Sequence, residues 1–226
     1  MFKNTQKVIR SAGQSLLSNN RQFFGIEDLK RTRKELIKVL ESEIEGEIED
    51  ASRKQYIEDF LNKNGWKIEA HPSLTKIQLV KQVDSTHVRV VYNAKAPQSF
   101  DPETEGNEES DSQGEQNIFE FFTVLDKNIP KKLVINFMIM DGDMSINRVF
   151  VTDNADAIID SDDSSAYLYS GPEYDTLAET LQRRIQKYVQ QFGINEEFGN
   201  FLEDSSHHHE ANLYKRLLTD LKDVLQ

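Results

Sequence analysis

The hydrophobic pattern of the chain begins with a helical period after residue 25. From Ile26 to about Arg53, apolar residues recur four or seven positions apart while Glu and Lys fill the other faces. This spacing predicts one amphipathic helix, in which Gly46 is a weak point. The recurring positions are Leu29, Leu36, Leu40, Ile44 and Ile48. A second helical piece is predicted over 54–62, with a stop at Asn64-Gly65.

The pattern changes at Trp66 from a helical period to a period of two. Alternating, β-branched or aromatic runs cover residues 66–70, 77–81, 87–92, 118–125, 133–139, 144–151 and 166–170. Asp84-Ser85 and Asp141-Gly142 are short enough for hairpin turns between such runs. Consecutive strands joined by short turns predict an antiparallel meander. Because 118–125 is apolar on both faces, and Met138 and Met140 follow in a later strand, the second face of the sheet is not expected to be wholly polar.

Helical periodicity returns after Gly171-Pro172 and continues to the end of the sequence. An apolar stripe reaches Phe192, Gly193 supplies a left-handed helix end, and Asn195 caps the last helix. The order helix, sheet, helix pair predicts an α+β fold without internal repeats. Most apolar helix positions are interpreted as intramolecular core, and the alternative is a helix–helix oligomer interface. The positions assigned to helix packing are Leu36, Leu40, Tyr214, Leu218, Leu221 and Leu225.

The charge of the chain is strongly negative and unevenly distributed. Lys and Arg number 27 against 39 Asp and Glu, which gives a formal charge of −12. Residues 1–24 carry four cations and no acid, with Ser and apolar residues between them, as in a mitochondrial transit peptide. A disordered basic tail is the alternative. Loss of the four cations takes the charge from −12 to −16 and leaves a single acidic domain over 25–226.

Two segments concentrate the acidic residues. Residues 96–116 contain no basic residue and almost nothing apolar, which predicts a disordered acidic loop, and 153–163 is a shorter acidic connection. Such charge repels phosphate backbones and attracts cationic partners in a salt-dependent way. The residues predicted to bind partners are Asp101, Glu103, Glu105, Glu108, Glu109, Asp111, Glu115, Asp153, Asp156, Asp160, Asp162 and Asp163.

Metal binding and catalysis find little support in the motifs. The run Asp101-x-Glu103-x-Glu105-Gly106 copies the start of a calcium-binding EF-hand loop, but its twelfth position is Ser112 instead of Glu. Three adjacent histidines at 207–209 cannot converge on one ion from a helix. The sequence has no cysteine, no P-loop, no GxSxG and no HExxH, and no run of 18 apolar residues. We therefore expect neither an enzyme nor a cofactor, metal or membrane-inserted segment.

From Tyr169-Ser170-Gly171-Pro172 to the C-terminus, the sequence resembles the mitochondrial acidic matrix protein family, also called the mitochondrial glycoprotein family, to which the complement globular-head receptor belongs. The stripe at 177–188, the run Gly193-Ile194-Asn195-Glu196-Glu197 and the leucines near the end carry the resemblance, which extends upstream to about residue 28. It departs from the family pattern at Phe192, where Arg is frequent, and at Leu217, where Trp is common. The stretch 207–209 also differs.

The resemblance implies a twisted seven-stranded antiparallel sheet flanked by N- and C-terminal helices, assembled as a doughnut-shaped homotrimer. It also implies a non-enzymatic adaptor in the mitochondrial matrix. Such a protein would capture basic RNA-binding or ribosomal proteins and thereby support mitochondrial RNA processing, translation and oxidative phosphorylation, contacting nucleic acid only indirectly. The alternatives are a direct RNA-binding module and an acidic protein that binds divalent metals.

Overall fold

The computed structural model describes residues 25–47, 50–94, 118–140, 142–160 and 172–226. The chain divides into two compact units, which we call the helical unit (1–46 and 218–226) and the sheet unit (47–217). The helical unit contains α2 (Ile26–Gly46) and the last residues of α6 (Glu196–Leu225). An ion pair joins them, because Lys222 Nζ lies 3.0 Å from Glu41 Oε1. Among the described helices, none is long and apolar enough to cross a membrane.

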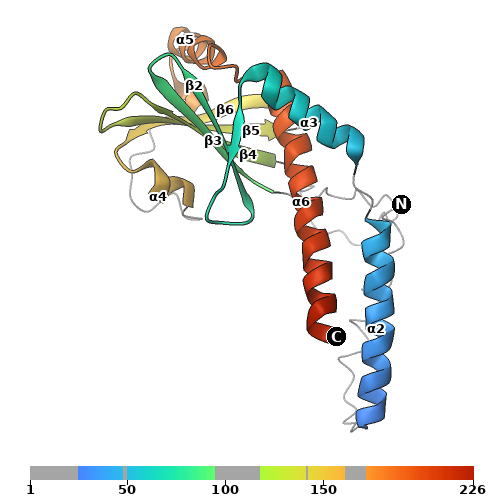
Figure 1. The fold of residues 1–226 in the computed structure, drawn as a ribbon. Coiled ribbons are helices and arrows are strands. Elements are labelled where there is room, and N and C mark those ends of the chain that lie inside the picture. Colours follow the sequence, from blue (N-terminus) through green and yellow to red (C-terminus); the bar gives the residue numbers. More distant parts are fainter. Residues whose placement is uncertain (1–24, 48–49, 95–117, 141, 161–171) are drawn as a thin grey trace, which may run out of the picture. The chain divides into compact units, whose positions relative to one another are not determined.

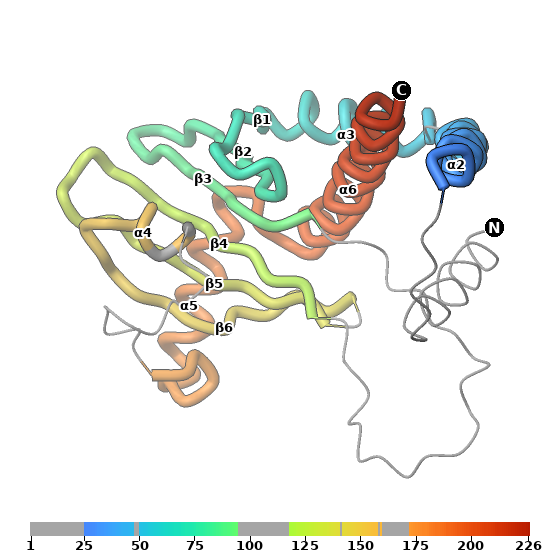
Figure 2. Tube along the Cα trace, turned by 90° about the horizontal axis from the view of Figure 1, so that it is seen from below, coloured from blue at the N-terminus to red at the C-terminus, as the bar shows by residue number. Residues whose placement is uncertain are grey.

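The sheet unit is built on six described strands in chain order, each antiparallel to the next (Figures 1 and 2). The strands are β1 (Lys67–Glu69), β2 (Lys76–Val83), β3 (Thr86–Asn93), β4 (Ile118–Asp126), β5 (Lys132–Met140) and β6 (Asp143–Thr152). The predicted meander is confirmed. Asp84 and Gly142 take positive φ angles of 50° and 86° in the two predicted hairpin turns. The predicted strand at 166–170 lies outside the described residues.

Helices cover both faces of the sheet to different extents. α3 (Ala51–Asn64), α5 (Glu179–Gln190) and the first part of α6 share one large core cluster with the sheet. A short 3-10 helix, η2 (Tyr174–Thr176), precedes α5, and α4 (Ala155–Asp160) lies on the other side of the sheet from α5 (Figure 1). The second cluster, under α4, is Val91, Val124, Val134, Ala155 and Ile159. The second face is therefore partly apolar, as its sequence pattern indicates.

Aromatic side chains join the main core across elements that are distant in the sequence. Phe201 of α6 stacks on Phe60 of α3, with ring centroids 4.1 Å apart and planes inclined by 9°. Phe121 stacks on Phe137 of the next strand at 4.7 Å, and Phe198 meets the edge of Phe121 at 6.3 Å. Asn195 caps α6 as predicted, because its Oδ1 accepts the Phe198 amide at 3.0 Å. This cap orients α6 so that its first turns enter the core.

Three predicted elements differ from the structure. The single helix over 26–53 is wrong: α2 ends at Gly46, and Asp50 starts α3 by accepting the amides of Ser52 and Arg53. The acidic connection at 153–163 contains α4, whose residues Ala155 and Ile159 are buried. In the run that starts at Trp66, the indole is buried while Ile68 is 53% exposed, because β1 is an edge strand of three residues.

Candidate acidic binding surface

The structure places only part of the predicted acidic surface. Asp153 is exposed, and Asp160 ends α4. The Asp156 carboxylate is also exposed, but it lies 2.5 Å from the Arg89 guanidinium and is already paired. Outside the described residues are Asp101, Glu103, Glu105, Glu108, Glu109, Asp111, Glu115, Asp162 and Asp163.

One end of the second sheet face combines carboxylates with exposed apolar side chains. Strand pairing sets Ile118 opposite Met140 and Glu120 opposite Met138, and Met140 is also opposite Asp143. Directly opposite residues share a face, as do residues two apart on one strand. We call these five residues the open corner. Ile118 is 37% and Met140 41% exposed, and the carboxylates of Glu120 and Asp143 are also exposed.

The open corner has the chemistry to hold a basic, amphipathic segment. Its two carboxylates can pair with Lys or Arg, while flexible Met side chains adapt to the apolar stems of those cations. In the sequence, Ile118 comes two residues after the end of the acidic 96–116 segment, so the chain enters this corner from that segment. The sequence prediction missed Glu120 and Asp143. Strand alternation and register identify them, because both align with the methionines of the second face.

At the opposite end of β4, the same face holds a small charged cavity of about 240 Å³. Its charges are largely paired within the face: Lys132 Nζ lies 3.3 Å from Asp126, and Gln78 donates to Glu69 at 3.2 Å. Arg89 reaches out to Asp156 of α4, as described above. Because both cations and anions line the cavity, it has no excess of either charge and gives no electrostatic preference for an acidic or a basic partner.

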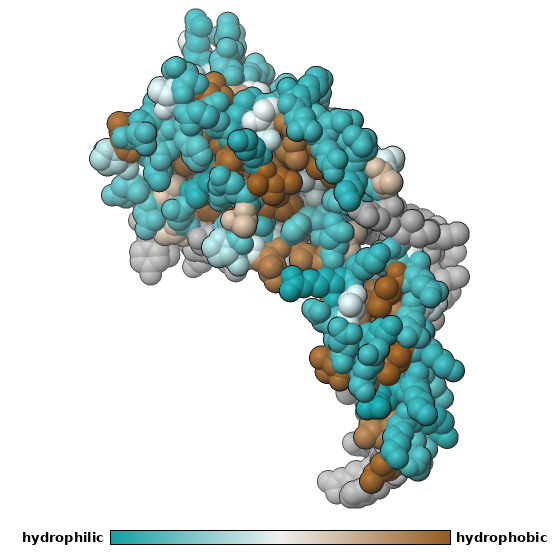
Figure 3. All heavy atoms as spheres, in the orientation of Figure 1, coloured by the Kyte–Doolittle hydropathy of each residue, from teal (hydrophilic) through white to brown (hydrophobic). Residues whose placement is uncertain are grey.

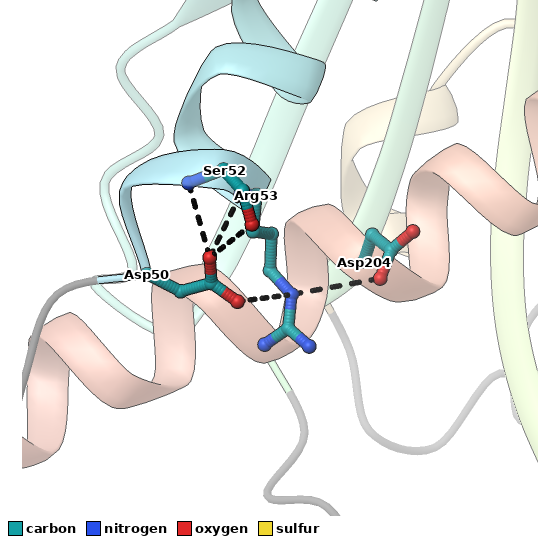
Figure 4. A network of polar contacts seen from close by, with 4 residues as sticks. All are labelled: Asp50, Ser52, Arg53 and Asp204. Atoms are coloured by element: carbon teal, nitrogen blue, oxygen red, sulfur yellow. Dashed lines mark hydrogen bonds and ion pairs between the residues drawn. The ribbon is translucent and has the colours of Figure 1, made fainter.

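A polar network connects α3 and α6 within the sheet unit (Figure 4). The Arg53 Nε lies 4.0 Å from Asp50 and 3.6 Å from Asp204, and Lys63 lies 3.5 Å from Glu197. The Ser52 hydroxyl donates to Asp50 Oδ1 at 2.6 Å, and this bond, with the Arg53 amide, lowers the pKa of the Asp50 carboxyl. The carboxylates of Asp50, Asp204 and Glu197 pair with cations, and Asp50 also caps the start of α3. Their role is therefore structural.

The lowered pKa of Asp50 gives the stability of the chain a pH dependence with a definite sign. A carboxyl whose pKa is lower in the folded state stabilises that state above its unfolded pKa, and the stabilisation is lost as pH falls through the folded pKa. The ordinary pKa of an aspartate is 3.8, so the loss occurs in the acid range below that value. We expect Asp50→Asn, which keeps a capping oxygen, to lower the free energy of unfolding at neutral pH and to approach the native chain in acid.

Urea unfolding at several pH values measures this difference. Ser52→Ala is the matched variant, because it removes the hydroxyl that contributes most to the lowered pKa. It is expected to reduce the pH dependence while leaving the carboxylate in place. Parallel pH profiles for the native chain and Asp50→Asn would show that this carboxylate has no such role.

The residues assigned to helix packing fall in both units. In the helical unit, Leu40 and Leu218 are buried, whereas Leu36 and Leu221 are 45% and 44% exposed and Leu225 is half-buried. Tyr214 is half-buried in the sheet unit. The residues assigned to helix packing are therefore not all buried within one chain.

The histidines of α6 have structural contacts. His207, His208 and His209 are half-buried, and the His209 Nε2 is 2.8 Å from the Leu74 carbonyl oxygen. The three histidines therefore do not form a fully solvated helix face, because the loop before β2 lies against this helix. Within the described part of the chain, no group of three or more His, Cys, Asp or Glu side chains is placed to hold a metal ion.

A sequence model of the mitochondrial glycoprotein (MAM33) family matches residues 40–225. The chain belongs to this family. A hypothetical Leishmania major protein, described as a sequence homologue of human p32, superposes with a TM-score of 0.64 at 18% identity over 86% of this chain and 99% of that one. The p22 protein of Trypanosoma brucei gives 0.61 at 19% identity with the same coverage.

Family membership and fold together support a coarse functional assignment. The two trypanosomatid structures show the same fold, an antiparallel sheet flanked by N- and C-terminal helices. Membership in the mitochondrial glycoprotein family indicates a mitochondrial protein with a protein-binding role. The strong net negative charge of −12 gives that role its chemical character.

Proposed function

We propose that the chain is a non-enzymatic adaptor of the mitochondrial matrix that captures basic proteins, in particular RNA-binding or ribosomal ones. Residues 1–24 would act as its transit peptide. Through these partners the protein would support mitochondrial RNA processing, translation and oxidative phosphorylation. The observation that carries the proposal is the open corner, where exposed Glu120 and Asp143 flank apolar side chains, in a chain of net charge −12.

The physical mechanism is multivalent electrostatic capture. One exposed ion pair contributes only about 0–1 kcal/mol, so affinity must come from the number of contacts. The predicted acidic positions on 96–116 and 153–163 add further negative charge to the two carboxylates of the open corner in each copy of the chain. Linking several such surfaces in one assembly turns later contacts into intramolecular ones and raises the overall affinity without new chemistry.

A binding assay with three probes tests the proposal. The purified chain is presented with a lysine-rich protein, an acidic protein of similar size and a naked single-stranded RNA. We expect binding of the lysine-rich protein alone, and retention of RNA only when that protein is present. If naked RNA bound as tightly as the basic protein, the alternative of a direct RNA-binding module would replace the adaptor. If none of the three probes bound and the chain bound only a divalent cation, the alternative of a metal-binding acidic protein would replace the adaptor.

We further propose that three copies assemble through the helical unit. Ile26, Leu29 and Leu36 recur at spacings of three and seven on α2 and are 74%, 67% and 45% exposed. Leu221 and Val224 add exposed apolar surface on the end of α6. Brown apolar patches accordingly interrupt the teal surface of the helical unit (Figure 3). Exposed apolar surface of this kind supports burial against another copy of the chain.

Introducing charge among these exposed apolar residues of α2 and α6, which we call the helical-unit stripe, should dissociate the assembly. The double variant Leu36→Glu/Leu221→Glu places a carboxylate at two half-exposed stripe positions, where burial against another copy would be unfavourable. We expect light scattering to show a mass about one third of that of the native assembly, with the circular dichroism of the sheet unit retained.

Lys38→Glu is the matched control, because Lys38 is exposed on the same helix and outside the stripe. It should keep the mass of the native assembly. A native chain that is monomeric, or a double variant that keeps the native mass, would show that the stripe does not hold a trimer.

A further inference from the structure

One side of α5 carries cations beside exposed apolar side chains. Leu181, Arg184 and Tyr188 recur at spacings of three and four, so they share one side of the helix. Lys187 follows Arg184 by three positions and extends this side. Leu181 is 48% and Tyr188 38% exposed, and both cations are exposed. Lys127, in the turn between β4 and β5, holds its ammonium 5.8 Å from the centre of the Tyr188 ring. We call these five residues the α5 face.

The cations of the α5 face have no carboxylate partner within the chain. Among the described residues, no carboxylate forms an ion pair with Lys127, Arg184 or Lys187. The neighbouring Lys132, by contrast, is paired with Asp126 at 3.3 Å. In a chain of net charge −12, this is a local basic surface with apolar side chains beside it. Its complement is a surface that brings carboxylates together with apolar groups.

The open corner of the same unit has this complementary composition. It offers the exposed carboxylates of Glu120 and Asp143 beside Ile118 and Met140, which are 37% and 41% exposed. We propose that the α5 face of one copy of the chain binds the open corner of a second copy. The cations of the α5 face pair with the two carboxylates, and its apolar side chains cover Ile118 and Met140.

The contact cannot form within a single chain. Lys127 directly follows β4, whereas Ile118 begins it, so the two surfaces are separated by the length of a nine-residue strand, about 27 Å. They also belong to opposite faces of the sheet, because α5 packs on the main core and the open corner lies on the second face. A contact between two different surfaces, repeated from copy to copy, closes a ring or continues as a filament.

Other anionic occupants fit the α5 face less well. A nucleic acid would stack its bases on an exposed aromatic ring, but Lys127 lies over the Tyr188 ring and Phe192 meets that ring edge-on at 5.2 Å. The net charge of −12 also opposes the approach of a phosphate backbone or an anionic bilayer. A second copy brings its carboxylates already placed beside apolar side chains.

The contact rests on the open corner of the proposed function and adds a competition to it. The α5 face occupies the carboxylates that a basic partner needs, so a lysine-rich protein should displace it. The two proposals fail separately, because the contact between copies is measured without any partner. A lysine-rich protein that binds without displacing the α5 face would contradict capture at the open corner alone.

Carbodiimide cross-linking of the full chain tests the contact. This reagent joins a carboxylate to a lysine amine as an amide, without a spacer, so it reports groups at ion-pair distance. Isotopically labelled and unlabelled chains are mixed in urea and refolded together, and cross-linked peptides are identified by mass spectrometry. A pair with one labelled and one unlabelled peptide comes from two copies. We expect such mixed pairs to join Lys187 to Glu120 or Asp143.

Charge reversal on each surface supplies a specific control. Arg184→Glu and Asp143→Lys both keep the reacting groups of Lys187 and Glu120. Each variant alone should reduce the mixed Lys187–Glu120 pairs at least about threefold, because an attractive contact becomes repulsive. Refolding the two variants together should restore the pair between Lys187 of the Arg184→Glu chain and Glu120 of the Asp143→Lys chain, since the two reversals complement each other. Lys67→Glu, on exposed β1, is the matched variant and should change nothing.

Three results would overturn the proposal. They are the absence of mixed pairs between the α5 face and the open corner, equal losses for Lys67→Glu and Arg184→Glu, and no recovery when the two reversed chains are combined. A further result would reassign the α5 face to another anion. This result is binding of single-stranded RNA or phosphatidylserine vesicles that Arg184→Glu abolishes, in a chain that gives no mixed pairs.

Discussion

Phe121→Ala is expected to lower the free energy of unfolding by about 3–5 kcal/mol, the cost of removing a buried phenylalanine and leaving a cavity. Phe121 is fully buried at the centre of the sheet, stacked on Phe137 with planes inclined by 3° and met edge-on by Phe198. Phe137 and Phe198 pack against the ring from two different elements, so the space that it leaves is expected to remain as a cavity. Native domains have only about 5–15 kcal/mol of stability in total, so this loss is a large fraction of it.

Urea unfolding followed by circular dichroism and by Trp66 fluorescence measures this loss. Phe121→Leu should lower the free energy of unfolding by less than Phe121→Ala, because leucine keeps part of the buried volume. Leu181→Ala is the matched surface control: Leu181 lies on α5 and is 48% exposed, so its loss should stay near about 0.5 kcal/mol. Equal losses for Phe121→Ala and Leu181→Ala would contradict the position of Phe121 at the centre of the core.

Reversing both charges of the open corner should weaken the capture of a basic protein at least about tenfold at low salt. In Glu120→Lys/Asp143→Lys, two attractive contacts become repulsive in every copy of the chain. Each exposed contact is worth about 0–1 kcal/mol, and an assembly applies the change several times over. The substitutions lie on exposed strand positions, so circular dichroism should show an unchanged sheet.

Asp175→Lys/Glu179→Lys provides the matched control for this measurement. These residues are exposed on η2 and at the start of α5, and the double substitution changes the net charge by the same amount. It should weaken binding only about two- to threefold, through the long-range field. If both double variants weakened binding equally, net charge alone would drive capture and the open corner would have no local role.

Much of the sheet could be predicted from the sequence because short-range chemistry determines it. The turns at Asp84 and Gly142 and the cap at Asn195 depend on residues a few positions apart, and the structure confirms all three. The two-sided apolarity of 118–125 likewise predicts a second face that is not wholly polar, and the apolar cluster under α4 confirms it. Local signals were thus sufficient wherever neighbouring residues decide the conformation.

The failures have two causes, which are a local cap signal outweighed by apolar periodicity and the tertiary context of distant residues. The break between α2 and α3 depends on Asp50 capping a new helix after Gly46, although apolar periodicity continues across it. The pairing of Asp156 with Arg89 depends on where α4 packs against the sheet. The grouping of Glu120 with Asp143 depends on strand register across β4, β5 and β6. Register is a long-range property, so the sequence identified acidic segments and missed the carboxylates that the sheet brings together.

The salt dependence of binding to a lysine-rich protein tests the central claim most directly. The dissociation constant of the full chain is measured by calorimetry from about 50 mM to about 500 mM sodium chloride, across which exposed charges become largely screened. Multivalent electrostatic capture predicts a steep, continuous weakening of at least about a hundredfold over this range. A dissociation constant that stays the same from low to high salt would contradict the claim that acidic charge is what captures the partner.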